Sequence, residues 1–396
     1  MMPRILFITA GGRHPEYSSG HISRCLVSAR RILKASSEAR FAFMMPEDEY
    51  GESLFVKEGY RPVIYRSLQE EKRLLARLIR DWDPHVLVLD RLDVDPEFAR
   101  WIKQFERIMV SLDDGGSAVN FCDLAMNPLI PNPRSEYPGY PYLTLEELKR
   151  APAIEKLKAG AAQCLISVGG YDADGLLGRL LRALRGIPGA DALKVHVFAG
   201  VEARQNGALR SELAGFDKAS ELHGYSGRFL EVLQSSDAAI VAGGLSMFES
   251  TRRGIPTLVI SNKDHQKFNI RNLERAGAVL YGGHTDEIPG ARFSAAAEKL
   301  ILESAARRNL AEGALEFWAG IPRVPSALDL IQIVTVDARR QSAKRRSAVL
   351  WPKRLTQPIL TYAAMFAKHH KIDHVIPYAW QEHSKPSSKE LLYAPS

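Results

Sequence analysis

Short apolar runs rich in Val, Ile and Leu alternate with longer amphipathic stretches along most of the chain. This alternation is typical of βαβ units, in which helices cover both faces of a parallel sheet. In the first half it predicts strands at Arg4–Thr9, Phe41–Met45, Pro62–Tyr65, His85–Asp90 and Ile108–Leu112, and helices at His21–Leu33, Ser67–Asp81 and Pro96–Phe105.

The alternation stops between Asn127 and Pro152, where the chain carries six prolines. Proline continues neither a helix nor a central strand, so we expect a crossing between two domains here. The pattern then resumes, with strands predicted at Gln163–Val168, Lys194–Ala199, Ala238–Ala242, Pro256–Ile260 and Val279–Tyr281, and helices at Asp172–Leu184, Ala203–Leu213, Arg228–Ser235, Ser246–Arg253, Lys267–Ala276 and Ala295–Phe317. We therefore predict an N-terminal domain at 1–150, a second α/β domain at 151–335 and an extension at 336–396.

The charge of the chain is concentrated in the extension. It holds 11 Lys or Arg against 4 Asp or Glu, whereas the first 335 residues hold 42 of each sign, so the tail accounts for the net charge of +7. A neutral body does not fit a nucleic-acid-binding protein. A basic tail suits an anionic membrane face or another partner, and Ile359–Phe366 within it predicts an amphipathic helix that either meets such a surface or packs back on the body.

The composition is that of a globular protein, with 45% hydrophobic and 25% charged residues. No apolar run approaches the roughly 20 residues that cross a bilayer. The first strand starts almost at once, so we expect no signal peptide. Cys25, Cys122 and Cys164 are widely spaced and form neither a disulfide framework nor a zinc pattern. We expect a cytoplasmic protein, peripheral at the inner face of the plasma membrane if the tail binds there.

His21 is the first candidate for chemistry, because Gly20-His21-Ile22-Ser23-Arg24 follows the first predicted strand and opens the first predicted helix. Ligands of α/β proteins bind where helices start at the carboxyl ends of parallel strands. A histidine at a helix amino end is kept neutral by the helix dipole, which suits a general base. The alternative is an ordinary first-turn residue.

Two Gly-Gly turns in the second half resemble phosphate sites. Gly243-Gly244 follows a predicted strand and precedes a predicted helix, and Gly169-Gly170 is the analogous turn one unit earlier. Glycines allow close approach of a ligand to backbone N–H groups. Ser246 and Glu249 predict either a capping box or a glutamate that accepts hydrogen bonds from ribose hydroxyls. Asp172 predicts either a helix cap or a ligand contact.

Two further polar groups leave alternatives open. Gln266 and Asn269 lie one helical turn apart, which suits either sugar hydroxyls or a plain polar helix start. Asp90, Asp93 and Asp95 follow a strand and would suit a divalent cation, but aspartate is common in turns anyway, and we expect no metal and no cofactor.

Together these motifs resemble a known group. Residues 3 to about 335 are similar to the UDP-sugar hydrolase of pseudaminic acid synthesis and its relatives among spore-coat polysaccharide proteins. The resemblance rests on Gly20-His21-x-x-Arg24, Leu112-Asp113-Asp114, Cys122-Asp123-Leu124 with Asn127, and Gly169-Gly170-x-Asp172. It implies the GT-B fold, two Rossmann-like domains facing across a cleft, and a role for His21 in activating water. Ser18 stands where a glycine is common, and the tail has no counterpart.

The second half also resembles the peptidoglycan N-acetylglucosaminyltransferase that makes lipid II. That likeness implies ribose binding at Glu249, donor-sugar binding along Asp264-His265-Gln266-x-x-Asn269, and a uracil pocket near Tyr225 and Phe229. The predicted substrate-binding residues are Gly20, Arg24, Asp113, Asp114, Gly169, Gly170, Asp172, Tyr225, Phe229, Gly243, Gly244, Ser246, Met247, Glu249, Gln266 and Asn269.

Three functions follow as hypotheses. The first is a UDP-sugar hydrolase of surface-glycan or nonulosonic acid synthesis that cleaves the C–O bond with inversion, with His21 deprotonating water. The second is an inverting glycosyltransferase with the same donor, in which His21 deprotonates an acceptor hydroxyl; the basic tail favours a membrane-associated acceptor. The third is a nucleotide-sugar binder without catalysis.

Overall fold

The computed structural model describes residues 3–12, 19–145, 161–170, 172, 175–200, 207–224, 228–322 and 331. The chain divides into two compact units. One contains Met1–Tyr17, His21–Thr144 and the chain from Ile321 onward, and the other contains Ser18–Gly20 and Leu145–Gly320. The basic extension and Ser18 lie outside the described residues. The predicted boundaries at 150 and 335 stay predictions, because the residues around them also lie outside that set.

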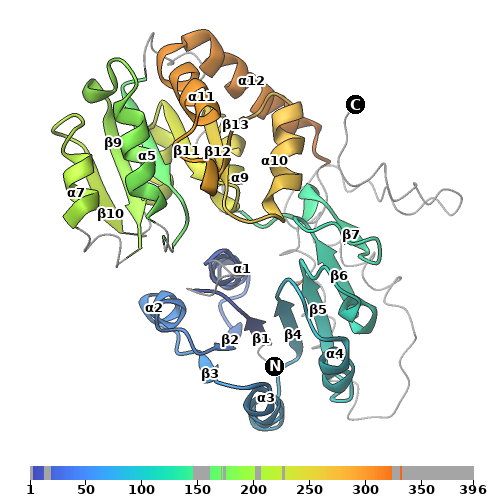
Figure 1. Cartoon of the computed structure of the whole chain (residues 1–396). Coiled ribbons are helices and arrows are strands. Elements are labelled where there is room, and N and C mark those ends of the chain that lie inside the picture. Colours follow the sequence, from blue (N-terminus) through green and yellow to red (C-terminus); the bar gives the residue numbers. More distant parts are fainter. Residues whose placement is uncertain are drawn as a thin grey trace, which may run out of the picture. The chain divides into compact units, whose positions relative to one another are not determined.

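The first unit is built on a fully parallel sheet with the strand order β3-β2-β1-β4-β5-β6-β7 (Figure 1). Its strands are β1 (Arg4–Thr9), β2 (Arg40–Pro46), β3 (Val63–Tyr65), β4 (Val86–Asp90), β5 (Ile108–Leu112), β6 (Leu124–Asn127) and β7 (Tyr137–Pro138). Its helices are α1 (Gly20–Ala35), α2 (Glu49–Lys57), α3 (Leu68–Trp82) and α4 (Pro96–Lys103), with short 3-10 turns η1 (Ala118–Phe121) and η2 (Tyr140–Tyr142).

Alternating strand residues place two apolar layers on this sheet. Ile5 and Phe7 pack with Ile22 and Ala29 of α1 on one face, while Leu6 and Ile8 pack with α3 and α4 on the other. Because both faces are covered, the central strands are buried at nearly every position, which explains why the sequence shows continuous apolar runs there. Ile331 is fully buried in the first of these layers, so the chain returns to this unit after α12.

The second unit repeats the same plan, with the parallel strand order β10-β9-β8-β11-β12-β13. Its strands are β8 (Gln163–Ser167), β9 (Lys194–Ala199), β10 (Glu221–Gly224), β11 (Ala238–Ala242), β12 (Thr257–Ser261) and β13 (Leu280–His284). Its helices are α5 (Leu176–Arg185), α7 (Gly207–Leu213), α8 (Phe229–Ser235), α9 (Leu245–Arg252), α10 (Gln266–Arg275), α11 (Ala291–Leu302) and α12 (Ser304–Gly320), with η4 (Ala190–Ala192) and η5 (Thr285–Glu287).

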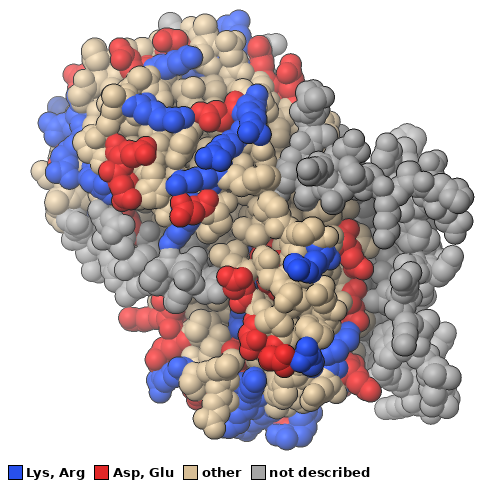
Figure 2. All heavy atoms as spheres, turned by 45° about the vertical axis from the view of Figure 1, so that its right-hand side comes forward, with Lys and Arg blue, Asp and Glu red and all other residues tan. Residues whose placement is uncertain are grey.

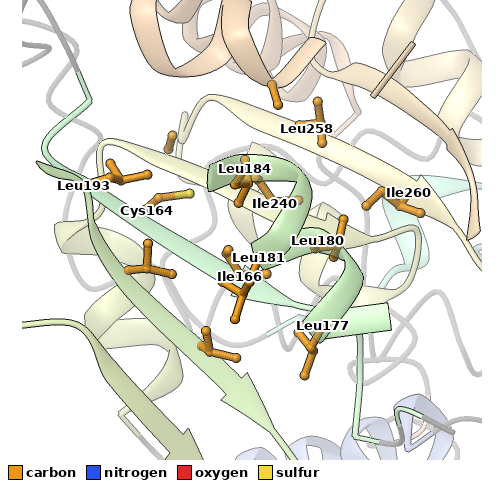
Figure 3. Packing of buried hydrophobic residues seen from close by; sticks show 14 of the residues in the cluster. Cys164, Ile166, Leu177, Leu180, Leu181, Leu184, Leu193, Ile240, Leu258 and Ile260 are labelled. Atoms are coloured by element: carbon orange, nitrogen blue, oxygen red, sulfur yellow. The ribbon is translucent and has the colours of Figure 1, made fainter. Parts of the chain in front are cut away.

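The core of the second unit forms where α5 lies on its sheet. Figure 3 shows Leu177, Leu180, Leu181 and Leu184 of α5 directed at Ile166 and Ile240 of the central strands β8 and β11. Leu177, Leu181 and Leu184 recur at i, i+4 and i+7, so one stripe of the helix is apolar, as expected for a helix covering a sheet. This packing fixes the carboxyl ends of the central strands, where the candidate ligand groups lie.

The predicted parallel α/β organisation is confirmed, with three kinds of difference in detail. The pattern missed the helix α2 and the short strands β6, β7 and β10. The proline-rich stretch is not wholly a crossing, since β7 pairs with β6 as an edge strand of the first sheet, a position that tolerates proline. The helix predicted at Ala295–Phe317 is two helices, because Glu303 adopts an extended conformation between α11 and α12.

The break at Glu303 is held by a buried arginine. Arg307 Nη1 donates to the carbonyls of Leu300 and Ile301, at 2.9 and 2.7 Å, and these carbonyls belong to the last turn of α11. A donor there satisfies the carbonyls that a helix end leaves without partners. Amphipathic periodicity continues across the break, so the pattern alone predicted one helix.

The surface of the described part carries both signs of charge. Figure 2 shows Lys and Arg interspersed with Asp and Glu over the face in view, in keeping with the even balance of charges in the first 335 residues. None of the helices within the described residues combines the length and the apolar character needed to cross a bilayer.

Candidate active site

The strand order of the first unit identifies its ligand-binding edge. From β1, the strand order proceeds through β2 to β3 towards one edge of the sheet. From β4, which lies beside β1, it proceeds through β5 and β6 to β7 towards the other edge. In such doubly wound sheets ligands bind beyond the carboxyl ends of the two strands where the order reverses. Here those strands are β1, which leads into α1 and His21, and β4, which ends at Asp90.

His21 and Asp90 meet at that edge. Nδ1 of His21 lies 2.6 Å from Oδ1 of Asp90, and both side chains are buried. An ionised carboxylate only accepts hydrogen bonds, so Nδ1 carries the proton in this contact. The lone pair of the neutral ring then resides on Nε2. The carboxylate therefore fixes the tautomer and the orientation of the His21 ring.

Arg24 keeps Asp90 ionised. One turn after His21 on α1, Arg24 donates through Nε to Asp90 Oδ2 at 2.9 Å, and through Nη2 to Oδ1. Burial by itself raises the pKa of Asp90, but the charges and hydrogen bonds of Arg24 and His21 outweigh it and bring that pKa well below its usual range. Burial alone would lower the pKa of Arg24, but the nearby carboxylates of Asp90 and Asp113 raise it.

Asp113 extends the network to the next strand. Its Oδ2 accepts from Arg24 Nη1, and its Oδ1 accepts from the backbone N–H groups of Leu129 at 2.7 Å and Ile130 at 3.1 Å. Asp113 has a φ of 55°, in the left-handed region that a non-glycine residue rarely adopts. The strained turn after β5 thus aims this carboxylate at α1. With neutral His21, the cluster of Arg24, Asp90 and Asp113 carries one net negative charge, which a proton on His21 would balance.

Asp114 is a second buried carboxyl on the same turn. Its Oδ1 accepts from Gly116 N at 2.8 Å, and Asn127 and Asn132 both donate to its backbone carbonyl. Among the described residues, Oδ2 of Asp114 and Oδ1 of Asn127 have no hydrogen-bond partner. Burial raises the pKa of Asp114. The predicted pair Asp113–Asp114 therefore divides into an ion-paired member and a desolvated one.

In the second unit the order reverses between β8 and β11, and a Gly-Gly turn follows each of them. After β11, Gly243 packs under α10: a Cβ at this position would lie 2.7 Å from Cδ1 of Ile270 and 3.1 Å from Cβ of Gln266. A Cβ at Gly244 would meet nothing within 4 Å. Gly243 serves close packing, whereas Gly244 borders open space at the start of α9.

The two helix starts differ in how their N–H groups are used. At α5, Asp172 accepts from Leu176 N at 2.7 Å and from Leu177 N at 3.2 Å, so it satisfies the first N–H groups of the helix as predicted, although the N-cap residue is Gly175. At α9, Gly244 is the N-cap and no side chain caps the helix. The capping box predicted from Ser246 and Glu249 is therefore wrong, because the helix begins one residue before Ser246. The first N–H groups of α9 remain suited to an anion.

The remaining predicted residues lie around these strand ends. Glu249 and Ser246 are partly exposed on α9 and Met247 is fully buried, so any ligand contact of Met247 would come from its backbone. Gln266 and Asn269 are buried at the start of α10, and Gln266 Oε1 accepts from Asn262 N at 3.1 Å.

Phe229 is buried edge-to-face against Phe198. Gly169 follows β8 with a φ of 100° and Gly170 is buried; Tyr225 lies outside the described residues.

The metal site considered at Asp90, Asp93 and Asp95 is not formed. Within the described ranges these carboxylates do not gather into a group of potential metal ligands. Asp90 is bound to His21 and Arg24, and Asp95 caps α4 through Glu97 N at 3.0 Å. The sequence had indicated Asp90 only as a candidate metal ligand, whereas the structure shows it as the hydrogen-bond partner of His21 and Arg24. Its position at the end of β4, beside the strand that leads into His21, was the signal for its contact with the histidine.

Comparison with known proteins supports the fold. No family model matches the chain. It is 23% identical over 286 residues to the spore coat polysaccharide biosynthesis protein SpsG of Bacillus subtilis, covering 69% of this chain and 82% of SpsG. This match supports the resemblance to spore-coat polysaccharide proteins inferred from the motifs.

Two solved glycosyltransferase structures resemble the fold of this chain. The spinosyn rhamnosyltransferase SpnG has a TM-score of 0.59 at 17% identity, over 84% of this chain and 99% of that one, and it has also been solved with thymidine diphosphate. MurG of Acinetobacter baumannii has a TM-score of 0.52 at 14% identity, over 79% and 95% of the two chains. The two units have the fold of GT-B glycosyltransferases.

Proposed function

We propose that this protein is an inverting glycosyltransferase that uses a nucleoside diphosphate sugar, with His21 as the general base. The contact between His21 and buried Asp90 carries the proposal, because it gives the ring the tautomer and orientation of a base at the binding edge of the sheet. The GT-B fold, and the thymidine diphosphate bound to SpnG, support a nucleotide-linked donor.

In the proposed reaction, Nε2 of His21 takes the proton of an acceptor hydroxyl. The hydroxyl oxygen attacks the anomeric carbon from the face opposite the leaving group, the bond from that carbon to the diphosphate oxygen breaks, and the nucleoside diphosphate departs with the electron pair. General-base help of this kind contributes roughly 10²–10⁴-fold. The positive charge on His21 is balanced by Asp90 and Asp113, since Arg24 offsets only one of the two carboxylates.

The second unit supplies the donor-binding groups in this proposal. The uncapped start of α9 takes the diphosphate, and its N–H groups stabilise the negative charge that develops on the leaving oxygen. Glu249 accepts hydrogen bonds from the ribose, and Gln266 and Asn269 contact the donor sugar. We infer that the nucleoside is uridine, because the second half of the chain resembles the peptidoglycan N-acetylglucosaminyltransferase that makes lipid II. Phe229 would lie beside the uracil base.

A UDP-sugar hydrolase is the second candidate, since water in place of the acceptor requires the same base and the same donor site. It is favoured by the Gly20-His21-x-x-Arg24 signature, whose arginine holds Asp90 in the structure. Transfer and hydrolysis therefore differ in the nucleophile, an acceptor hydroxyl or water, and share the proposed base and the proposed donor site.

The test is to incubate the full chain with a panel of UDP- and TDP-sugars and to measure nucleotide release with and without glycan or lipid-linked acceptors. Transfer predicts release that depends on an acceptor and a product with inverted anomeric configuration. Release at the same rate without any acceptor would assign the hydrolase. Binding of nucleotide without release under any condition would overturn both.

A further inference from the structure

A group of two histidines and a glutamate lies on the second sheet, where Phe198 separates it from Phe229, the residue assigned to the base of the donor. His196 is in β9, and Glu221 and His223 are in the edge strand β10. The parallel register pairs Glu221 with His196 and His223 with Phe198. Alternation along β9 sends Val195 and Val197 into the core under α5 and α7, so His196 projects from the opposite face.

The potential ligand atoms of these three side chains are close together. Nδ1 of His196 lies 2.9 Å from Nε2 of His223, which lies 3.6 Å from Oε2 of Glu221. All three ligand atoms are within 4.8 Å of one another. Ligands around a tetrahedral Zn²⁺, at about 2.0–2.2 Å from the metal, are separated by about 3.4 Å. The two separations of 2.9 and 3.6 Å are close to this value, and the third, between His196 and Glu221, is no more than 4.8 Å.

The two histidine side chains are largely buried and the glutamate is exposed, which would hold the ligands in place and let a metal ion enter from solvent. His196 is 4% exposed, the side chain of His223 is 9% exposed, and that of Glu221 is 47% exposed. The histidines are thus held by packing, with His223 stacked between His196 and Phe198, while the glutamate leaves access from solvent.

A metal ion would replace a contact between the two rings. Two neutral rings can share one N–H···N hydrogen bond through Nδ1 of His196, and Nε2 of His196 has no partner among the described residues in either state. Two cations oppose metal binding: Lys194 Nζ lies 4.0 Å from Glu221 Oε1, and the charge of Arg228 acts on both histidines. Lys194 approaches the oxygen of Glu221 that faces away from His223, so Oε2 is the oxygen placed to act as a ligand.

We propose that His196, Glu221 and His223 bind a divalent transition-metal ion, with water completing the coordination. Two imidazoles and one carboxylate form a donor set that zinc and related ions use in proteins. The ion would join β10 to β9 by side-chain ligands in addition to the backbone ladder. Because Gly224 ends β10 at the carboxyl edge of the sheet, the ion would brace the edge strand beside the donor-binding groups.

The test uses the full chain without a polyhistidine tag, stripped with chelator and titrated with Zn²⁺ by calorimetry and with Co²⁺ by visible absorption. We expect one ion per chain, a Co²⁺ spectrum of low coordination number, and a higher unfolding temperature with Zn²⁺. His223→Gln should weaken binding by roughly 100-fold. The matched control is His284→Gln, since His284 lies 3.0 Å from Asp286 Oδ2, caps η5 through Asp286 N and, within the described ranges, belongs to no group of potential metal ligands; the metal affinity of this variant should stay that of the wild type.

Two exposed positions keep the proposal testable if the histidine variant fails to fold. Glu221→Gln should weaken binding by about tenfold or more, because an amide is a poor ligand. Lys194→Gln should tighten it by roughly fivefold, because a cation near a divalent ion is removed. Absence of saturable Zn²⁺ and Co²⁺ binding, or equal weakening in His284→Gln, would overturn the proposal.

Discussion

The guanidinium of Arg24 and the carboxylate of Asp113 form a buried ion pair across 89 positions of sequence. The pair joins the helix that carries His21 to the turn after β5, and Arg24 simultaneously holds Asp90. One arginine therefore sets the charge around the proposed base. The expected behaviour of variants follows from this arrangement.

Removal of the proposed base should affect turnover and not donor binding. For His21→Asn we expect a loss of about 10²–10⁴-fold in kcat, because Nε2 no longer accepts the proton. Nucleotide affinity, measured by calorimetry with UDP, should remain that of the wild type. A variant that kept its full rate would exclude His21 as the base.

Asp90→Asn should remove the negative charge beside His21 and change the tautomer of its ring, while the side chain keeps nearly the same size. The amide can donate to Nδ1 of His21, which would move the ring proton to Nε2 and occupy the lone pair needed for catalysis. We expect a loss of roughly 10²–10⁴-fold in rate. Steady-state kinetics across pH 5–9 provide the measurement, and a rate within threefold of the wild type would remove Asp90 from the mechanism.

Arg24→Met should destabilise the first unit by about 3–5 kcal/mol at pH 7, since Asp90 and Asp113 would both stay buried without a cation. In the wild type the lowered pKa of Asp90 contributes stability above its unfolded value near 4, and this is lost as the pH falls below it. In the variant the freed carboxyls can take up protons, so its deficit should shrink from pH 7 to pH 4.

Urea unfolding at these pH values measures the effect. The matched control is Arg30→Met on the same helix, because Arg30 pairs with Glu58 at 3.1 Å on the surface, and exposed pairs contribute about 0–1 kcal/mol. Equal destabilisation by the two substitutions would contradict a special role for Arg24.

Asp114 should show the opposite pH dependence. Its pKa is raised by burial, so the folded state holds its proton more tightly than the unfolded chain, and the stability this gives at low pH is lost as the pH rises through the raised value. Asp114→Asn keeps an acceptor for Gly116 N and removes the buried charge. The variant should gain stability relative to the wild type between pH 4 and pH 7; thermal unfolding that shows no such trend would refute the assignment.

The two adjacent glycines before α9 should respond differently to alanine. Gly243→Ala meets Ile270 and Gln266 and should cost about 1–3 kcal/mol of folding stability. Gly244→Ala has open space, so its unfolding free energy should stay within about 0.5 kcal/mol of the wild type while nucleotide affinity falls. Thermal unfolding and UDP titration distinguish these effects, and undiminished affinity in Gly244→Ala would argue against a diphosphate there.

The sequence predicted the parts of the fold that depend on buried parallel strands. Strands such as β4 and β11 are apolar at almost every position, so composition alone identifies them. It did not predict β7, which has only two residues and contains a proline. It also did not predict β10, which is mostly polar and pairs with β9, 25 positions earlier. The break at Glu303 was missed because it is held by Arg307, whose buried position no local pattern shows.

The candidate site was predictable to the extent that it follows strand ends. His21, Gly243 and Gly244 could be found from a strand followed by a glycine and a helix. The contact of His21 with Asp90 depends on β1 and β4 being neighbours, which requires the strand order. His196 and His223 meet only because β9 pairs with β10 in one register, and 26 intervening positions conceal that from the sequence.

The burial of Ile331 in the core of the first unit has a consequence for folding during synthesis. The β1 and α1 residues of that core emerge from the ribosome early, whereas Ile331 follows only after the whole second unit has been made. At about 5–20 residues per second, the first core would wait roughly 10–40 seconds for this side chain. The core of the earlier-made unit thus stays incomplete until the later-made unit has been synthesised, and an amino-terminal fragment ending near Thr144 should expose an apolar gap that recruits chaperones or aggregates.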